Sequence, residues 1–152
     1  MQDTTLSVAS LLVPLENELM LLPNAAVAEI IGYQDPAAVE NGPDWLLGLM
    51  SWRGISLPLI SLEVMRGGEP PLRADRTRIA VMNSVTGSQD LQFYAVVLRG
   101  IPGLVRATQD VVLPGSDSEA RPEGVLCHAL VNGDPAMIPD LDAVERMLQE
   151  GR

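Results

Sequence analysis

Apolar residues in this chain occur in short runs that are separated by glycine, proline and polar residues. Short apolar runs bounded by turn residues are typical of the strands of a β-sandwich or a β-barrel. The pattern therefore predicts a mainly β fold with few helices. The predicted strands are Ser10–Leu15, Glu18–Leu22, Ala28–Tyr33, Leu49–Trp52, Ile55–Ile60, Arg78–Ser84, Leu91–Leu98, Ile101–Ala107, Val125–Val131 and Ala136–Ile138.

One turn is marked more clearly than the others, at Asn132-Gly133. Both central residues of a type I′ turn need a positive φ, and Asn followed by Gly adopts that conformation at low cost. The pair therefore predicts a tight hairpin between the last two strands. Weaker turn signals at Glu16-Asn17 and at Thr86-Gly87 predict two further hairpins.

Helical periodicity is confined mainly to the C-terminal segment. Its apolar face consists of Leu141, Val144 and Leu148. Asp140 or Asp142 can cap the start of this helix, and Gly151 lies where a left-handed C-terminal residue is expected. Two short helical turns are also expected, at Asn24–Val27 and at Ser61–Met65, because each begins with a residue type that caps helices.

The chain has 152 residues, which is enough for a sizeable core without disulfides or metal. It is therefore expected to form one ordinary globular domain, residues 1–152, or two small intertwined ones. Both halves repeat paired strands followed by a turn that contains glycine, which hints at two similar small barrels. Gly67–Pro71 is typical of a linker, so we place the boundary between the halves in residues 67–77.

Charge excludes several classes of partner. Ten basic residues stand against twenty acidic ones, and the net charge of −10 repels nucleic acid and anionic membrane surfaces. All ten basic residues are arginine, which excludes lysine Schiff bases and phosphate-loop lysines. Trp45–Trp52, the longest uncharged apolar stretch near the middle, is too short for a bilayer, so we expect no membrane insertion.

The chain has one cysteine, Cys127, and one histidine, His128. An internal disulfide and the usual Cys/His zinc cluster are therefore excluded. We expect no cofactor and no metal, and no export signal at the N-terminus. A reducing, cytoplasmic location fits this cysteine usage.

Two residue pairs would have to carry the chemistry if the chain were a small β-barrel enzyme. Cys127 and His128 are adjacent on a predicted strand, where neighbouring side chains point to opposite faces, so they are interpreted as packing residues. Asp140 and Asp142 precede a helix, where acidic residues usually cap the helix and interact with its dipole. A third feature, Trp52-Arg53-Gly54, combines residue types enriched at interface hot spots. Given the acid excess, Arg53 is equally suited to an intramolecular salt bridge.

Several blocks of the sequence, from Leu11 to Leu148, carry a resemblance to a known family. Leu11–Pro23 followed by Val27–Ile31 is similar to an opening hairpin and a "Leu-Pro, three variable residues, Val-x-Glu-Ile" pattern. Gly48 followed by Arg53–Leu62 is similar to the most specific signature, "Gly, four variable, Arg-Gly, Pro-Val-Ile-Asp-Leu". Further similar blocks are Ala95–Ile101, Leu104–Arg106, Asn132-Gly133 and Ile138–Leu141. The chain thereby resembles the CheW-type coupling proteins of bacterial chemosensory arrays.

The resemblance implies a fold of two intertwined five-stranded SH3-like barrels with a shared core, short helices and a C-terminal helix. It implies a scaffold or adaptor in chemotaxis signal transduction, without catalysis. The implied partners are the tip of a methyl-accepting chemoreceptor and the regulatory domain of a CheA-type histidine kinase, with other CheW-like proteins as further partners. The implied location is cytoplasmic, at receptor arrays on the inner membrane.

The resemblance also implies binding residues. Val27, Glu29, Gly48 and Arg53 match positions that the family uses for receptor coupling, although Val27, Gly48 and Leu104 could equally serve only to pack the barrels. Ile101 and Leu104 match a neighbouring apolar ridge. Together with the distinctive turn, the expected protein-binding residues are Val27, Glu29, Gly48, Trp52, Arg53, Gly54, Ile101 and Leu104.

Four residues depart from the family pattern. Ser61 and Arg99 each replace an aspartate, Trp52 replaces an aliphatic residue, and Pro139 interrupts the last aliphatic run. Because these changes alter charge at candidate contact positions, the sequence favours an accessory coupler of a pilus-linked system, which drives twitching by type IV pili, over a standard flagellar array. An adaptor that does not bind the kinase is the alternative.

Overall fold

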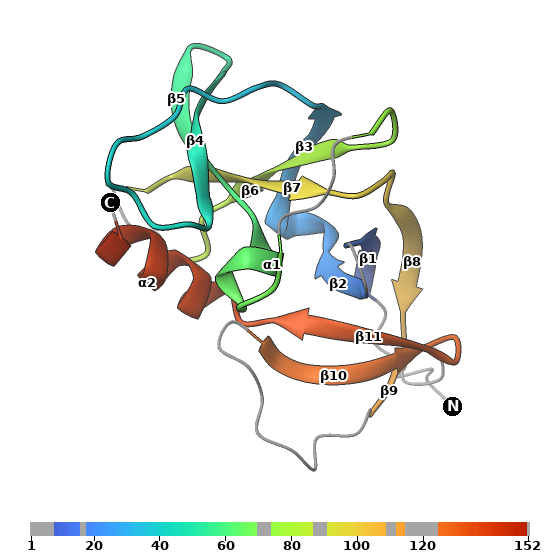
Figure 1. Ribbon diagram of the computed structural model, residues 1–152. Coiled ribbons are helices and arrows are strands. Elements are labelled where there is room, and N and C mark those ends of the chain that lie inside the picture. Colours follow the sequence, from blue (N-terminus) through green and yellow to red (C-terminus); the bar gives the residue numbers. More distant parts are fainter. Residues whose placement is uncertain are drawn as a thin grey trace, which may run out of the picture.

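The computed structural model describes residues 8–15, 18–69, 74–86, 91–108, 112–114 and 125–151, and it contains two β-sheets with helices between them (Figure 1). The strands of the first sheet are β1 (Val8–Pro14), β2 (Leu19–Pro23), β8 (Gly103–Ala107), β9 (Val112–Pro114), β10 (Val125–Val131) and β11 (Asp134–Pro139). Those of the second are β3 (Val27–Gly32), β4 (Leu46–Trp52), β5 (Ile55–Ile60), β6 (Arg78–Asn83) and β7 (Phe93–Leu98). The strand orders are β8-β1-β2-β11-β10-β9 and β3-β6-β7-β5-β4.

The path of the chain intertwines the two sheets. It leaves the first sheet after β2, passes through the short 3₁₀ turn η1 (Asn24–Ala26), builds the whole second sheet and returns at β8. Each sheet contains one parallel strand pair among antiparallel ones, β2 with β11 and β5 with β7. Residues 67–77, the expected linker, connect α1 (Leu62–Met65) to β6, and residues 70–73 lie outside the described residues. Their role as a subdomain boundary stays a prediction.

The mainly β fold, with two intertwined sheets, short helices and a C-terminal helix, confirms the fold class expected from the sequence. The two largest differences have local causes, and the other strand ends differ from the predicted ones by at most two residues. β9 was not predicted, because its three residues are too few for an alternating pattern to be recognised. β4 begins three residues earlier than predicted, because an irregularity between Leu46 and Gly48 interrupts the alternation of its side chains.

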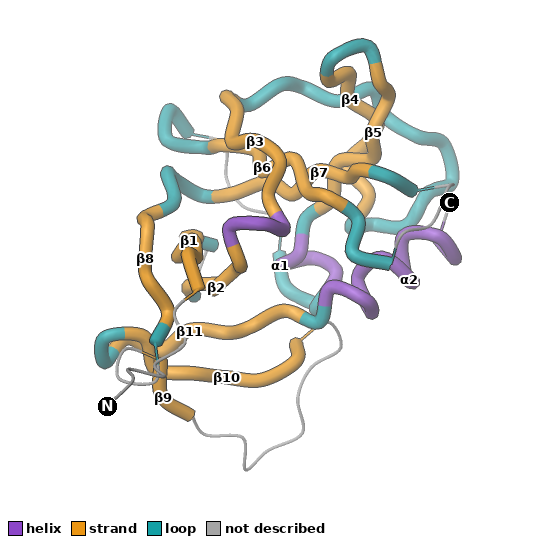
Figure 2. Tube along the Cα trace, turned by 180° about the vertical axis from the view of Figure 1, so that it is seen from behind, coloured by secondary structure: helices purple, strands orange, loops and turns teal. Residues whose placement is uncertain are grey.

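Both helices begin at the caps that the sequence indicated. The backbone N–H of Val64 donates to Oγ of Ser61 at 3.2 Å, and α1 starts at the next residue after Ser61. The N–H of Ala143 donates to Oδ1 of Asp140 at 3.1 Å, so Asp140 caps α2 (Leu141–Gly151). Gly151 is the last residue of α2 rather than the residue after it. The two helices lie close together between the sheets (Figure 2).

Three apolar clusters account for the core. The largest joins residues of both sheets and both helices, and it includes Val13, Leu22, Ile60, Met82, Val96, Met137, Val144 and Leu148. A second cluster lies within the five-stranded sheet and includes Met50, Trp52, Leu57, Leu59, Ile79, Val81, Ala95 and Val97. A smaller third cluster lies within the six-stranded sheet, around Leu21, Val131 and Ala136. Because the largest cluster is shared, neither sheet can be removed without exposing the core of the other.

The expected hairpin at Asn132-Gly133 is confirmed, because φ is 50° at Asn132 and 84° at Gly133. The other two expected turns include residues 16–17 and Gly87, which lie outside the described residues. Within the described part of the chain, no helix is long and apolar enough to cross a membrane.

Candidate functional site

The two outermost strands of the five-stranded sheet, β3 and β4, meet through side-chain contacts. Nε1 of Trp52, at the end of β4, donates to Oε1 of Glu29 on β3 at 2.8 Å. NH2 of Arg53 lies 3.4 Å from the same oxygen. These contacts link the two edges of the sheet and help to close it into a barrel. We call the group Glu29, Trp52, Arg53 and Gly54 the seam corner.

The turn that carries the seam corner has unusual backbone geometry. β4 and β5 form a hairpin in which Trp52 pairs with Ile55, and the two residues between them have φ values of 49° (Arg53) and 76° (Gly54). Two consecutive positive φ values are those of a type I′ turn. Glycine adopts this conformation freely, whereas arginine does so at a cost of about 1 kcal/mol. Such strain is typically retained where a side chain must be placed for function.

Trp52 is the buried base of the seam corner. Only 8% of the residue is exposed, and its ring centroid lies 5.0 Å from that of Phe93, with 58° between the ring planes. The guanidinium carbon of Arg53 lies 4.9 Å from the centroid of the Trp52 ring, which is within range of a cation–π interaction. The buried Trp52 therefore contacts both charged residues of the corner, Glu29 through its N–H and Arg53 through its ring.

The charged atoms of the seam corner remain accessible. The side chains of Arg53 and Glu29 are 68% and 39% exposed. An ion pair this exposed contributes about 0–1 kcal/mol to stability. Arg53 thus has the intramolecular partner that its sequence context allowed, but through a single, long contact that leaves most of the guanidinium free for another molecule.

Val27 and Gly48 have visible packing roles. Val27 is half-buried at the start of β3 and packs against the shared core. Gly48 is buried with φ at 150°, and a Cβ atom there would lie 2.3 Å from the backbone oxygen of Ala37. Ala37 and Leu49 exchange two backbone hydrogen bonds, so the close approach at Gly48 is part of the fold.

Ile101 and Leu104 belong to the other sheet, just before and within β8. They are 61% and 82% exposed, among the most exposed large apolar residues of the described chain. The structure therefore brings Glu29, Trp52, Arg53 and Gly54 together and places the apolar ridge on the other sheet.

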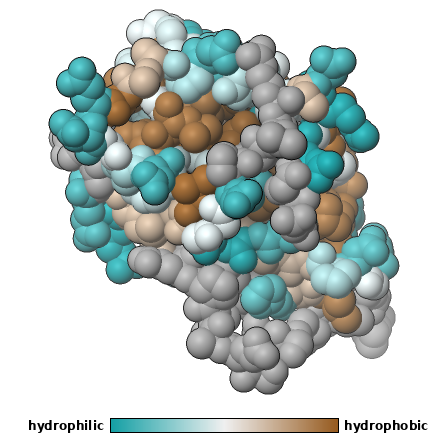
Figure 3. All heavy atoms as spheres, viewed as in Figure 1, coloured by the Kyte–Doolittle hydropathy of each residue, from teal (hydrophilic) through white to brown (hydrophobic). Residues whose placement is uncertain are grey.

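A pocket of about 370 Å³ lies beside β4 and β5, where apolar residues gather on the surface (Figure 3). It is lined by Val39, Glu40, Asn41, Gly42, Leu46, Leu49, Ser56 and Pro58. Among the described side chains that were weighed for catalysis, those of His128, Asp140 and Asp142, none lines it. Cys127 and His128 lie on β10, Asp140 is engaged as the cap of α2, and Asp142 is exposed in its first turn.

A buried glutamate, which the sequence did not single out, joins α2 to the β6–β7 hairpin. Glu145 is 0% exposed and accepts hydrogen bonds from Oγ of Ser84 (2.6 Å) and Oγ1 of Thr86 (2.8 Å). Two backbone N–H groups complete the set, those of Val85 (2.8 Å) and Thr86 (3.1 Å). We call this arrangement the Glu145 anchor. An acidic residue beside the apolar face of a helix is ordinary in sequence, so no sequence signal marks it.

The surroundings of Glu145 fix its charge. Burial on its own would raise the pKa of Glu145, but the hydrogen bonds from Ser84, Val85 and Thr86 outweigh burial and lower the pKa below its usual value. Burial, and then the charge of Glu145, raise the pKa of Tyr94. The hydroxyl of Tyr94 is buried and has no hydrogen-bond partner among the described residues. The carboxylate is therefore charged, and the phenol neutral, at physiological pH.

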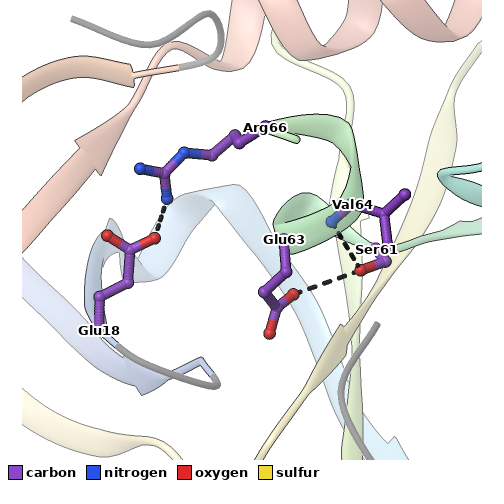
Figure 4. A network of polar contacts seen from close by, with 5 residues as sticks. All are labelled: Glu18, Ser61, Glu63, Val64 and Arg66. Atoms are coloured by element: carbon purple, nitrogen blue, oxygen red, sulfur yellow. Dashed lines mark hydrogen bonds and ion pairs between the residues drawn. The ribbon is translucent and has the colours of Figure 1, made fainter. Parts of the chain in front are cut away.

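A second ion pair crosses between the sheets. Arg66, directly after α1, contacts Oε1 of Glu18, which directly precedes β2 (Figure 4). The side chain of Arg66 is largely buried, and burial lowers its pKa. In the same view Ser61, which replaces the aspartate of the family pattern, caps α1 and also lies 3.4 Å from Oε1 of Glu63. Ser61 therefore keeps a helix-capping role without the charge.

Comparisons with known proteins agree with the fold. Residues 9–149 match the profile of a family described as CheW-like domain. The crystal structure of the scaffolding protein TtCheW from Thermoanaerobacter tengcongensis is similar, with a TM-score of 0.75 and 15% sequence identity. The similarity covers 93% of this chain and 89% of that one. A comparison with curated proteins found no match.

Proposed function

The chain belongs to the CheW-like domain family, and from this premise we propose that it is a non-catalytic coupling protein of a bacterial chemosensory system. In this proposal it links methyl-accepting chemoreceptors to a CheA-type histidine kinase in the cytoplasm, at receptor arrays. Membership of a scaffold family supports this role, because scaffold proteins bind partners and do not catalyse reactions.

The observation that carries the proposal is the seam corner. Receptor contact at this site is supported by an exposed arginine in a strained turn, next to an exposed glutamate and above a buried tryptophan. Arginine and tryptophan are the residue types that most often dominate the energy of protein interfaces. The exposed apolar side chains of Ile101 and Leu104 offer additional contact area for the same or a second partner.

The departures from the family pattern favour an accessory coupler of a pilus-linked system. Arg99 replaces an acidic residue with a basic one, and Trp52 adds a hydrogen-bond donor where the family has an aliphatic side chain. Partners of a standard array would meet altered charge and shape at these positions. We therefore propose that its partners are receptors and a kinase whose genes lie beside its own, and not those of a standard array.

A binding experiment tests the proposal. The purified full-length chain is used to capture the cytoplasmic fragment of a co-encoded receptor and the regulatory domain of a co-encoded kinase. We expect both to be retained. Capture of the receptor alone would identify an adaptor without kinase binding, and capture of neither would overturn the coupling function.

A charge reversal then tests the site. We expect Arg53→Glu to abolish receptor-dependent control of the kinase, because the guanidinium is lost and the new carboxylate beside Glu29 makes the corner negative instead of neutral. The far-UV spectrum and the melting temperature should stay near those of the wild type, since the pair is exposed. Arg146→Glu, at another exposed arginine on α2, is the matched control and should couple normally. Normal coupling by Arg53→Glu would exclude the seam corner as the receptor site.

A further inference from the structure

Only some of the hydrogen-bonding groups of the seam corner are engaged within the chain. Both donors, the indole of Trp52 and the guanidinium of Arg53, converge on one oxygen, Oε1 of Glu29. No donor among the described residues reaches Oε2, and NH2 is the only nitrogen of Arg53 that contacts a carboxylate there. The corner thus offers a partner one acceptor, Oε2, next to the unused N–H groups of Arg53.

The charges of the corner restrict what can bind there. Glu29 and Arg53 together carry no net charge, and the chain as a whole carries −10. An incoming carboxylate would be attracted by Arg53 but repelled by Glu29 and by the acidic surface. An incoming cation would be attracted by Glu29 and by the acidic surface but repelled by Arg53, so a group of either charge is opposed by one residue of the corner. A primary amide carries an N–H donor and a carbonyl acceptor side by side and has no charge. It therefore matches both free positions at once.

We propose that the seam corner binds the side-chain amide of an asparagine or glutamine on the receptor, and that Trp52 is the positioning residue that prepares it. The amide nitrogen donates to Oε2 of Glu29, and the amide oxygen accepts from Arg53. This inference rests on the proposed function, because the partner is the receptor.

The role of Trp52 follows from its surroundings. Its ring is held by burial and by Phe93, so its N–H has a fixed direction. The 2.8 Å hydrogen bond to Oε1 then fixes the carboxylate of Glu29, whose side chain would otherwise rotate freely at a surface position. The same ring lies under the guanidinium of Arg53. Ordering these groups before binding removes an entropic cost from binding itself.

The substitution Glu29→Gln gives a result whose sign identifies the partner group. The carbonyl oxygen of the new glutamine can still accept hydrogen bonds from Trp52 and Arg53. Its amide nitrogen, however, replaces the acceptor Oε2 by a donor on the side that faces the partner. A partner amide loses its acceptor, so we expect the affinity for the receptor's cytoplasmic fragment to fall about tenfold or more, as measured by calorimetry with the full chain. Tighter binding would show that the partner group is a carboxylate, and unchanged binding that nothing contacts Oε2. Either result would overturn the proposal.

The role of Trp52 is tested by Trp52→Phe, which keeps an aromatic ring and removes the N–H. We expect a loss of affinity similar to that of Glu29→Gln, and little further loss in the double variant, because both changes disable the same contact. Trp45→Phe, at the other tryptophan, is the matched control and should bind normally. If Trp52→Phe lowers the melting temperature but not the affinity, Trp52 is only a packing residue.

The same binding measurements distinguish a failure of the proposed function from a failure of the amide contact. If the wild-type chain does not bind the receptor fragment, the proposed function fails and the amide contact with it. If the wild-type chain binds and Glu29→Gln binds equally well or more tightly, only the amide contact fails.

Discussion

Two glutamates of this chain make comparable contacts in opposite surroundings. Glu145 is fully buried and accepts four hydrogen bonds from uncharged donors of one short segment. Glu29 is part-exposed and accepts two, one of them from a cation. Water cannot reach the buried carboxylate of Glu145, whereas it can reach that of Glu29. The same chemical group therefore serves stability in the Glu145 anchor and remains available for binding in the seam corner.

The comparison explains why polar contacts alone do not identify a functional site. The Glu145 anchor has the shorter and more numerous hydrogen bonds, and its carboxylate has a lowered pKa. Yet its donors and its acceptor are all engaged with each other, so nothing remains to bind a partner. The seam corner is weaker in itself, and its unused acceptor and donors are what a partner can reach.

The largest expected effect is that of removing the buried carboxylate. Glu145→Ala should lower the free energy of unfolding by about 2 kcal/mol, because four donors in the β6–β7 hairpin lose their carboxylate and only those of the exposed residues Val85 and Thr86 can turn to water. Urea denaturation followed by circular dichroism measures the change. Glu150→Ala, at an exposed position of the same helix, is the control and should change stability by less than about 0.5 kcal/mol. Equal effects of the two variants would contradict the role of the Glu145 anchor.

A smaller effect is expected from acid. Because the folded chain holds the pKa of Glu145 below its usual value of 4.5, the unfolded chain binds a proton first as the pH falls. The contribution of Glu145 is therefore fully present above pH 4.5 and is lost as the pH falls through and below this value. Unfolding free energies of the wild type and of Glu145→Gln, measured from pH 7 to pH 3, should converge at the acidic end. Parallel curves would refute the lowered pKa.

The two glutamates also show which features of the structure could not be predicted from the sequence. Alternating apolar residues predicted the strands, and the Ser61 and Asp140 caps predicted where α1 and α2 begin, because these signals are local. The contact of Glu29 with Trp52 joins residues 23 positions apart, and that of Glu145 with Ser84 joins residues 61 apart. Such contacts depend on how the barrels close, which no local pattern encodes.

Within the seam corner, the resemblance to a known family proposed Glu29 and Arg53 for binding, the distinctive turn added Trp52 and Gly54, and the structure places the four residues together. The resemblance could not indicate that Trp52 links Glu29 to Arg53, because the family has an aliphatic residue there. Nor could it separate Gly48, whose buried position serves the approach of Ala37, from exposed residues that a partner can touch.

The smallest expected effect concerns the strain in Arg53 and runs in opposite directions for stability and binding. Asparagine adopts a positive φ more readily than arginine or alanine, so Arg53→Asn should recover about 0.5–1 kcal/mol of strain while losing an exposed ion pair worth at most about as much. Its melting temperature should equal or slightly exceed that of the wild type, and it should exceed that of Arg53→Ala, which keeps the strain and loses the same pair. Receptor affinity should nevertheless fall about thirtyfold in both variants, because both lack the guanidinium. If Arg53→Asn folds as well as the wild type and binds worse, the strained arginine is kept for its partner. If Arg53→Asn binds as well as the wild type, the receptor contacts the turn and not the arginine.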